Sequence, residues 1–392
     1  MFYNKKAHYW SRTILTILAV SFAVASCGND PQVVPPGIIV TIAGTGQQGF
    51  AGEGEDALEA RFDAVGDVAA DALGNLFICD IFNHRIRRID GQTNIITTIA
   101  GTGYEADPMN DNGDFGGDGG PAVEALLSRP RHLVQDAAGN ILFLDLANHR
   151  VRKIEANTGI ITTIVGDGSD VLDGDGGAAV DASIGRPHGI ALDGAGNIYI
   201  AEFLNHRIRK VTISTGIIET IAGSGSTGFG GGGFSGDGGP AVEAELKFPA
   251  GGAFDPAGNY YFSDAGNNRV RKIDLSTRII TTVAGTGEAG YGGDGGAAVD
   301  ALLQSPRPLE IDSRNRLYIG DTNNHAIRMV DLNTGVITTI AGTGLQGYFG
   351  DGGLAVNARL DQPFGIELDE RTNSLYIASA GNHVIRRMGL PE

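Results

Sequence analysis

Two short phrases recur along the chain, and the order in which they alternate constrains its fold more than any other feature. The first is a strand-like run that ends in a Gly-rich turn, and its six copies cover 37–46, 95–103, 160–168, 217–225, 279–287 and 335–344. The second is built on Asn-His-Arg-Ile-Arg, and its six copies begin at Asn83, Asn148, Asn205, Asn267, Asn324 and Asn382. Self-similarity at a fixed period is typical of a repeat protein, in which each repeat is one structural unit.

The order of the two phrases predicts a closed ring. Five Asn-His phrases are followed by a strand-like phrase, but the sixth, at 382–388, is followed only by residues 389–392. Its missing companion stands at the opposite end of the chain, at 37–46. An open solenoid has no reason to displace one strand to the far terminus, whereas in a closed ring the N-terminal strand completes the last blade. We therefore expect an all-β, six-bladed β-propeller closed by strand exchange.

Each repeat predicts four antiparallel strands, as the third repeat illustrates. The apolar run at 189–193 is the innermost strand, and the Gly and Asn residues at 194–197 tolerate the positive φ that a tight hairpin requires. A second strand is expected at 198–202. The segment at 206–211 alternates apolar and polar residues with period two, as a half-buried strand does. The outer strand is expected at 217–222, and four antiparallel strands make one propeller blade.

The crossings between repeats predict short helices. In the crossing at 237–246, a Pro stands where a first helical turn tolerates it, and Ala and Glu favour helix. The two longest crossings, 103–120 and 225–239, account for the two longest intervals between Asn-His phrases. Insertions therefore fall on one face of the ring, which we call the loop face.

The Asn-His-Arg-Ile-Arg phrase followed by a strand resembles the NHL repeat, whose family forms six-bladed propellers. The resemblance covers 37–388, and three copies depart from the pattern: Asn268 replaces His, and Ala326 and Val384 replace Arg. The resemblance implies the fold but leaves the function open, because NHL-like rings serve as binding platforms, sensor domains and lyases.

The N-terminus resembles that of a bacterial lipoprotein. Lys5, Lys6 and Arg12 form a basic start, an apolar run covers 14–25, and small residues precede Cys27. In the lipobox, this Cys becomes the lipidated first residue of the mature protein; the alternative is an ordinary secretory signal that happens to contain Cys. We expect a signal peptide at 1–26, a tether at 27–36 and the propeller at 37–392.

The net charge bears on which partners the chain can bind, and its second cysteine has a predicted structural role. Without residues 1–26 the chain keeps 26 Lys and Arg against 46 Asp and Glu, a net charge of −20. Such a surface repels phosphate backbones, so we expect no nucleic-acid partner. Cys79 lies in a strand pattern and is expected to be a buried, inert thiol.

The repeated histidines are expected to be structural. His84, His149, His206, His325 and His383 occupy the same position in each blade, so a ring separates them by tens of ångströms. Each Asn-His phrase but the last follows an acidic residue by three positions: Asp80, Asp145, Glu202, Asp264 and Asp321. A carboxylate there can pair with an Arg of the repeat or hold the turn backbone.

Residues that break the repeat are better candidates for a site. The innermost strands converge on the central channel, and each begins at a Pro except in blade one. After that Pro, the default residue is small, yet three blades carry Arg131-His132, His188 and Arg307. One interpretation is a basic channel mouth that binds an anionic ligand, such as a carboxylate or uronic acid, through its guanidinium groups. The other is that these side chains pair with acids of neighbouring crossing loops.

Two metal interpretations remain open. The family resemblance implies that lyases use three channel histidines, but only His132 and His188 stand in suitable places, so a third ligand would have to be a carboxylate. Asp107, Asp111 and Asp114 in the long crossing could wrap Ca²⁺, the one cofactor the sequence suggests, although Asp-Gly clusters are equally the vocabulary of turns.

Two functions follow. The first is a non-enzymatic binding platform: a monomeric lipoprotein of the bacterial cell envelope, extracytoplasmic and held to the membrane only by its lipid, whose loop face binds a protein, peptide or glycan. The alternative is an enzyme of the NHL-like kind, a lyase or lactonase, with its site at the channel mouth. The absence of a nucleophile elbow, of a phosphate-binding loop and of zinc-ligand spacing in the sequence favours the platform.

Overall fold

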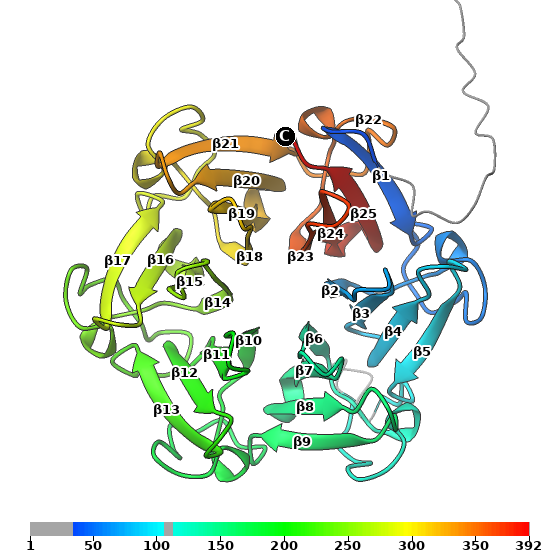
Figure 1. Ribbon diagram of the computed structural model, residues 1–392, viewed down its shortest axis with the longest axis horizontal. Helices are drawn as coiled ribbons and strands as arrows, with labels where there is room; N and C mark the ends of the chain where they lie inside the picture. The colour runs from blue at the N-terminus through cyan, green and yellow to red at the C-terminus, as the bar shows by residue number, and fades with distance from the viewer. Residues whose placement is uncertain (1–33, 106–112, 392) are drawn as a thin grey trace, which may run out of the picture. The chain divides into compact units, whose positions relative to one another are not determined.

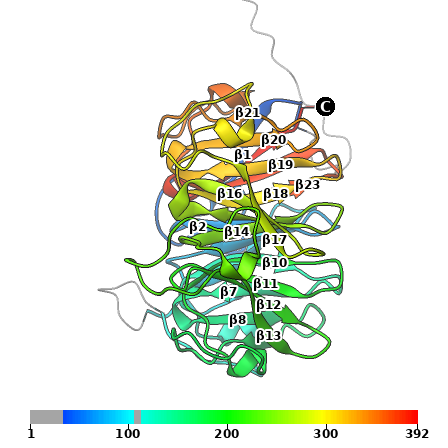
Figure 2. The ribbon, with the colours of Figure 1, turned by 90° about the vertical axis from the view of Figure 1, so that its left-hand side faces the viewer.

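The computed structural model describes residues 34–105 and 113–391. Within them the chain forms six antiparallel sheets set around a central axis, and seen edge-on the blades lie one beside the next (Figures 1 and 2). The predicted all-β, six-bladed propeller with four-stranded blades is confirmed. In that same part of the chain, no helix is long and apolar enough to cross a membrane.

All strands but one fall into four concentric sets; the exception is the two-residue β22 (Gly353–Leu354), which pairs with β1 at the outer edge of the last blade. The innermost strands are β2 (Val65–Ala70), β6 (Pro130–Gln135), β10 (Pro187–Leu192), β14 (Pro249–Phe254), β18 (Pro306–Ile311) and β23 (Pro363–Asp369). The second strands are β3 (Leu76–Asp80), β7 (Ile141–Asp145), β11 (Ile198–Glu202), β15 (Tyr260–Asp264), β19 (Arg316–Asp321) and β24 (Ser374–Ser379). The third strands are β4 (Arg85–Ile89), β8 (Arg150–Ile154), β12 (Arg207–Thr212), β16 (Arg269–Asp274), β20 (Ala326–Asp331) and β25 (Val384–Gly389).

The outer strands close the ring. Five of them follow the third strands in sequence: β5 (Ile96–Ala100), β9 (Ile161–Val165), β13 (Ile217–Ala222), β17 (Ile279–Ala284) and β21 (Val336–Ala341). The sixth is the N-terminal strand β1 (Ile38–Ala43), which pairs antiparallel with β25, with Ile39 opposite Met388 and Thr41 opposite Arg386. The predicted exchange of the N-terminal strand into the last blade is therefore confirmed.

The contact with the last blade begins slightly before β1. Val34 is buried, and Pro36 forms a bridge with Gly389. Of the segment predicted as a tether, residues 34–36 thus touch blade 6, while the signal peptide and Cys27 lie outside the described residues and stay predictions.

The predicted crossing helices are single 3-10 turns. They are η1 (Ala57–Glu59), η2 (Ala122–Glu124), η4 (Ala179–Asp181), η5 (Ala241–Glu243), η7 (Ala298–Asp300) and η9 (Ala355–Asn357). The helix expectation is wrong in length because the residue after each turn is already extended, as Ala125 is after η2. The residue before each turn instead bridges to the first residue of the outer strand of the following blade or to the residue just before that strand, as Pro121 does to Ile160. The crossings therefore cover outer edges that would otherwise be free to pair.

The core is divided among the gaps between neighbouring blades. Among the described residues, six clusters of buried apolar side chains are present, and each joins two adjacent blades. The cluster that closes the ring sets Tyr376 and Ile385 of blade 6 against Val68 and Ile78 of blade 1. Cys79 is buried as predicted, and burial raises the pKa of its thiol well above its usual value.

A buried arginine in each blade contacts the crossing loop, and in blades 1 to 5 it also contacts the acid of the inner turn. These arginines are Arg87, Arg152, Arg209, Arg271, Arg328 and Arg386. Arg152 contacts Asp145 of the inner turn at 3.4 Å and Asp118 of the crossing at 2.6 Å. Asp145 also accepts the backbone N–H of Ser128 at 2.7 Å. The predicted role of the repeated acids, pairing with Arg and holding the turn, is confirmed.

The repeated histidines join each blade to the next. Each adopts a left-handed backbone conformation, and its Nδ1 accepts a backbone N–H at the start of the next innermost strand. The pairs are His84 with Arg129, His149 with Arg186, His206 with Phe248, His325 with Gln362 and His383 with Ala64, at 3.0–3.3 Å. In blade 4, Asn268 replaces His and its Oδ1 accepts from Ser305 at 3.0 Å. The histidines are structural as predicted, but they act between blades rather than within one.

Candidate functional site in the central channel

The first residues of the innermost strands meet at the loop-face end of the channel. They surround a cavity of about 10 Å³, lined by Gly66, Arg131, His132, His188, Ala250, Gly251, Arg307, Pro308 and Phe364. All four residues predicted at the mouth are therefore brought together. A space of this size holds about one water molecule, so the mouth admits a small group rather than a whole ligand.

Arg131 and Arg307 carry the positive charge of the mouth. Both guanidinium groups lie over the ring of Phe364, at 4.9 Å and 5.2 Å from its centre. Among the described residues, neither has an ion pair or a hydrogen bond to a carboxylate. Burial and the charge of Arg307 lower the pKa of Arg131 to about 9, and the charge of Asp67 offsets only part of this effect.

The two mouth histidines are neutral at pH 7. Burial, together with the charges of Arg131 and Arg307, lowers the pKa of His188 well below its usual value. Burial and Arg131 lower the pKa of His132 to about 4. The ring of His188 stacks on Phe203 at 3.8 Å. Both histidines therefore offer hydrogen-bonding nitrogens to a ligand without adding charge.

Two buried nitrogen atoms at the mouth, His188 Nδ1 and Arg307 Nε, lack a hydrogen-bond partner within the part of the chain that the structure describes. A third, His132 Nδ1, has only a contact of 3.4 Å with Asp67 Oδ2. A buried polar atom without a partner costs about 1–3 kcal/mol. Their presence around one small cavity indicates a place where a polar group from outside can bind.

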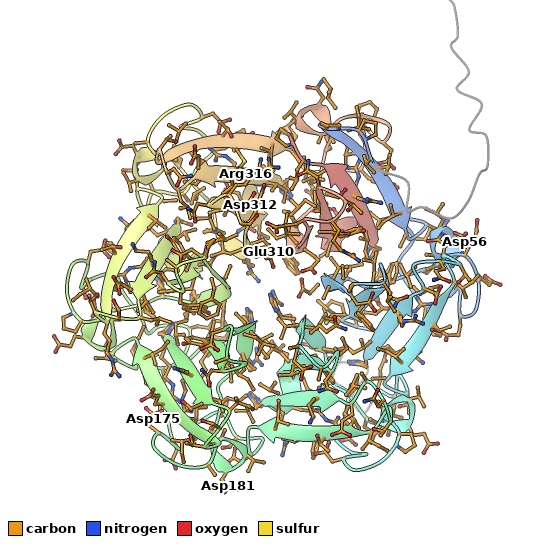
Figure 3. The ribbon with its side chains drawn as sticks, in the orientation of Figure 1. Asp56, Asp175, Asp181, Glu310, Asp312 and Arg316 are labelled. Atoms are coloured by element: carbon orange, nitrogen blue, oxygen red, sulfur yellow. The ribbon has the colours of Figure 1, made fainter. Side chains whose placement is uncertain are left out.

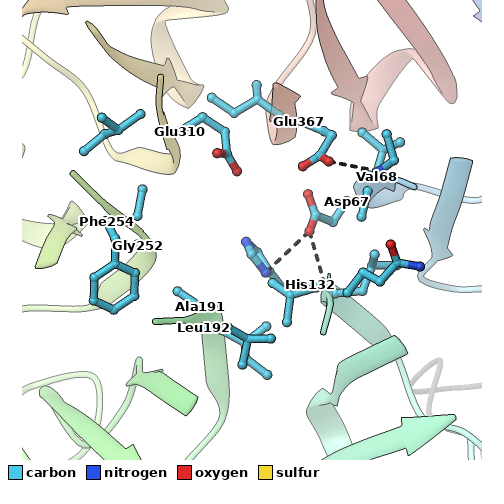
Figure 4. Close-up of a pocket in the computed structure, with 18 residues that line it drawn as sticks. Asp67, Val68, His132, Ala191, Leu192, Gly252, Phe254, Glu310 and Glu367 are labelled. Carbon is cyan, nitrogen blue, oxygen red and sulfur yellow. Dashed lines mark hydrogen bonds and ion pairs between the residues drawn. The ribbon is translucent and has the colours of Figure 1, made fainter. Parts of the chain in front are cut away.

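Deeper along the innermost strands, the channel widens into a chamber of about 390 Å³ (Figure 4). All six innermost strands line it, and three carboxylates face it from Asp67, Glu310 and Glu367. Glu310 lies by the central channel, in contrast to rim acids such as Asp175 (Figure 3). We call this space the acidic chamber.

Among the described residues, the three carboxylates of the acidic chamber have few hydrogen-bond partners and no Lys or Arg in contact. Asp67 accepts the backbone N–H of Leu133 at 3.1 Å and lies 3.4 Å from His132 Nδ1. Glu367 accepts the backbone N–H of Ala70 at 2.9 Å. Glu310 has no hydrogen bond or ion pair to another described residue. Opposite Asp67, a Cβ on Gly365 would lie 2.2 Å from Asp67 Oδ1, so glycine leaves the room that this side chain needs.

Burial and mutual repulsion hold protons on these carboxylates. Burial raises the pKa of Glu367 to about 8. Burial raises the pKa of Glu310 well above its usual value, and the charges of Glu367 and Asp67 add to the effect. Burial raises the pKa of Asp67 as well, although backbone hydrogen bonds from Leu133 and Val68 oppose it. At neutral pH the chamber therefore holds fewer than three negative charges.

The carboxylates of the acidic chamber were not among the site residues predicted from the sequence. Asp67 occupies a position that is Gly or Pro in four of the other blades, and Glu310 and Glu367 stand where the other blades have Ala or Val. These residues break the repeat just as the mouth residues do. The same comparison, carried two and four residues beyond each Pro, could have found them.

The structure places no metal cage among the described residues. Within these parts of the chain, no group of three or more His, Cys, Asp or Glu side chains is arranged to hold a metal ion. Of the predicted calcium loop, Asp107 and Asp111 lie outside the described residues. The backbone carbonyl of Asp114 accepts from Asn148 Nδ2 at 2.9 Å. Calcium binding by this loop stays a prediction.

The fold and its repeats define a class of protein. Residues 89–173 match the model of the teneurin NHL domain, and residues 185–211 match the model of the NHL repeat. Together with the six blades and their inter-blade histidines, these matches establish that the chain is an NHL-repeat six-bladed β-propeller.

A longer known protein contains a region similar in sequence to this chain. The chain is 31% identical over 315 residues to the chloroplastic protein SUPPRESSOR OF QUENCHING 1 of Arabidopsis thaliana, covering 79% of this chain and 28% of that relative. The chain thus spans less than a third of that protein.

Two solved structures, both from Bacteroides thetaiotaomicron, show the fold alone. A protein of unknown function has a TM-score of 0.65 at 18% identity and covers 89% of this chain and 74% of its own. An auxiliary nutrient binding protein has a TM-score of 0.62 at 17% identity and covers 89% of this chain and 75% of its own.

Proposed function

We propose that this propeller is a non-enzymatic binding platform, and that its channel mouth holds an anionic group of the protein, peptide or glycan that lies on its loop face. The observation that carries the proposal is the pair of guanidinium groups, Arg131 and Arg307, that share the ring of Phe364 without a carboxylate partner.

Half-buried positive charges without a carboxylate in contact are costly to keep. Desolvation lowers the pKa of both Arg131 and Arg307, which measures how poorly their surroundings stabilise the charged form. A bound anion would supply the missing partner, since charge-assisted hydrogen bonds from guanidinium to carboxylate are among the strongest in proteins. Phe364 holds the two groups in place by cation–π contact without neutralising them.

The nitrogen atoms without partners indicate which chemical group of the ligand the mouth binds. His188 Nδ1 and Arg307 Nε lie at the same small cavity and lack partners. One carboxylate has two oxygens that can accept several hydrogen bonds, so it can serve more than one of these atoms. Because the cavity holds about one water molecule, one oxygen of the acidic group enters it, and the rest of the ligand lies outside on the loop face.

The cellular setting completes the proposal. The basic start, the short apolar run and Cys27 support a lipid-anchored protein of the bacterial cell envelope, exposed outside the cytoplasm. Binding of a nutrient or envelope component suits such a location. The Bacteroides protein described as an auxiliary nutrient binding protein offers a parallel in fold and in role.

Calorimetric titration tests the proposal. Glucuronate is expected to bind the wild-type protein at pH 7, and neutral glucose to bind far more weakly. The R131A/R307A double variant should lose at least about tenfold in affinity, because hydrogen bonds to charged groups contribute about 1.5–3 kcal/mol. The matched control is R61A/R314A, which removes two exposed arginines and the same charge. Equal loss in both double variants would mean that only net charge matters and that the mouth is not the site.

A further inference from the structure

We infer that the acidic chamber is a second binding site, and that it takes an organic cation, such as a primary alkylammonium group with an apolar body. This inference goes beyond the anion site, because it concerns different residues at a different depth of the channel.

The chamber has the size and walls of a small-molecule site. Its volume of about 390 Å³ falls within the range of ligand pockets, about 300–1,000 Å³. Apolar side chains form much of its wall: Val134, Ile190, Leu192, Phe254 and Ile311. These walls favour a ligand with a hydrocarbon body and offer little to a hydrated inorganic ion.

The charged side chains that line the chamber are all acidic and lie on one side of it. Of the residues that line it, Asp67, Glu310 and Glu367 are acidic and none is Lys or Arg. The three carboxylates come from blades 1, 5 and 6, which are neighbours around the ring, so they face the chamber from one side (Figure 4). A cation placed between them would gain three partners at once.

Unused hydrogen-bonding atoms independently indicate a missing ligand. Glu310 has no hydrogen bond or ion pair to any other described residue, although it points into the chamber (Figure 4). His132 lines both the mouth and the chamber, and its Nδ1 makes only a long contact, 3.4 Å, with Asp67 Oδ2. A carboxylate is only an acceptor when ionised, and an ammonium group offers three donors, so the two chemistries match.

An organic cation fits the arrangement better than a metal ion. No group of three or more His, Cys, Asp or Glu among the described residues is placed to chelate a metal. Asp67 already accepts a backbone N–H, and so does Glu367. An ammonium on a flexible body can reach such dispersed carboxylates without drawing them into one coordination sphere.

Binding of the cation is coupled to release of protons. The titratable and charged groups that face the chamber are Asp67, Glu310, Glu367 and His132. The charge of Arg131 acts on Asp67, and the opposite charges of Asp369 and Arg371 act on Glu367. In the empty chamber, part of the carboxylates keep their protons; when an alkylammonium binds, those protons pass to the buffer and the carboxylates ionise. Affinity should therefore rise as the pH increases from 6 to 8.5, while the alkylamine itself stays protonated, with a pKa near that of Lys, about 10.4.

Titration with hexylammonium tests the inference. In wild-type protein we expect binding that is at least about tenfold tighter at pH 8.5 than at pH 6. Repeating the titration in buffers of different ionisation enthalpy should reveal release of protons at pH 7. E310Q and E367Q should each weaken binding at least about tenfold, whereas E288Q, which removes an exposed carboxylate outside the channel, should bind as wild type does.

Each remaining outcome decides against the site. No binding of hexylammonium by folded wild-type protein at pH 8.5, or unchanged affinity in both Glu variants, would overturn it. Binding of Ca²⁺ that depends on the same glutamates and displaces hexylammonium would reassign the chamber to a metal. Glucuronate binding at the mouth is read separately in the same proteins, so failure of one site leaves the other testable.

Discussion

His383 Nδ1 accepts the backbone N–H of Ala64 at 3.1 Å, across 319 residues of sequence. His383 belongs to the last blade and Ala64 to the start of the first, so this hydrogen bond helps to close the ring. The same bond links each of the remaining five pairs of neighbouring blades, with Asn268 in place of His in blade 4. The repeated residue that looks most like a catalytic group thus serves to join the blades.

Substitution of His383 should therefore separate hydrogen bonding from side-chain identity. H383A removes the acceptor and leaves the N–H of Ala64 without a protein partner, so we expect a loss of about 1–3 kcal/mol in the free energy of unfolding. H383N should retain most of the stability, because Asn268 performs the same task in blade 4. Chemical denaturation of the three proteins measures both effects. Equal losses in H383A and H383N would show that the imidazole matters for another reason.

These inter-blade bonds also predict a dependence on pH. Burial lowers the pKa of His206, whose Nδ1 accepts from Phe248. A folded pKa below the unfolded value, about 6.5, means that the contribution of His206 to stability is complete above pH 6.5 and is lost as the pH falls through the folded pKa.

The comparison with H206N isolates this contribution, since other titrating groups are shared. The free energy of unfolding of wild type minus that of H206N should fall between pH 7.5 and pH 5. Denaturation curves at several pH values provide the measurement. A difference that stays constant over this range would contradict the assigned role of His206.

Much of the fold could be predicted because each sequence repeat corresponds to one blade. The exchange of β1 into the last blade follows from a count of phrases alone, and its pairing with β25 is the one expected. The length of the crossing helices could not be predicted from their residue types. Ala and Glu favour helix locally, but the chain must return at once to the innermost strand, which leaves room for one 3-10 turn.

The candidate site could be predicted only in part. Arg131, His132, His188 and Arg307 were found because each replaces a small residue just after the Pro, and they do meet at one cavity. The narrowness of the mouth could not be predicted, because it depends on Phe364 of another blade filling the space beneath both guanidinium groups. The carboxylates of the acidic chamber lie further along strands that otherwise read as core.

Removal of the N-terminal strand should destabilise the whole ring. Deletion of 37–46 removes β1, exposes the edge of β25 and strips away the fully buried Ile39, so we expect a loss of at least about 3 kcal/mol and formation of oligomers. Thermal denaturation and light scattering measure the two effects. Deletion of 28–33 is the control, because the described contacts with blade 6 begin at Val34. A monomeric 37–46 deletion with an unchanged melting temperature would contradict strand exchange.

Lipidation at Cys27 remains a prediction from the sequence. C27S should block processing or release the protein from membranes, since the thiol that would carry the lipid is gone. Membrane fractionation of cells that express either form provides the measurement. A C27S protein that is processed normally and stays with the membrane would show that another feature anchors it.

The most direct test of the proposed binding function is a crystal structure of the protein with glucuronate. We predict that the carboxylate of the sugar acid lies at the channel mouth, within hydrogen-bond distance of Arg131 and Arg307, with the sugar ring outside on the loop face. Glucuronate bound elsewhere, or a mouth in which an acidic side chain of this chain already occupies the space between the two arginines, would contradict it.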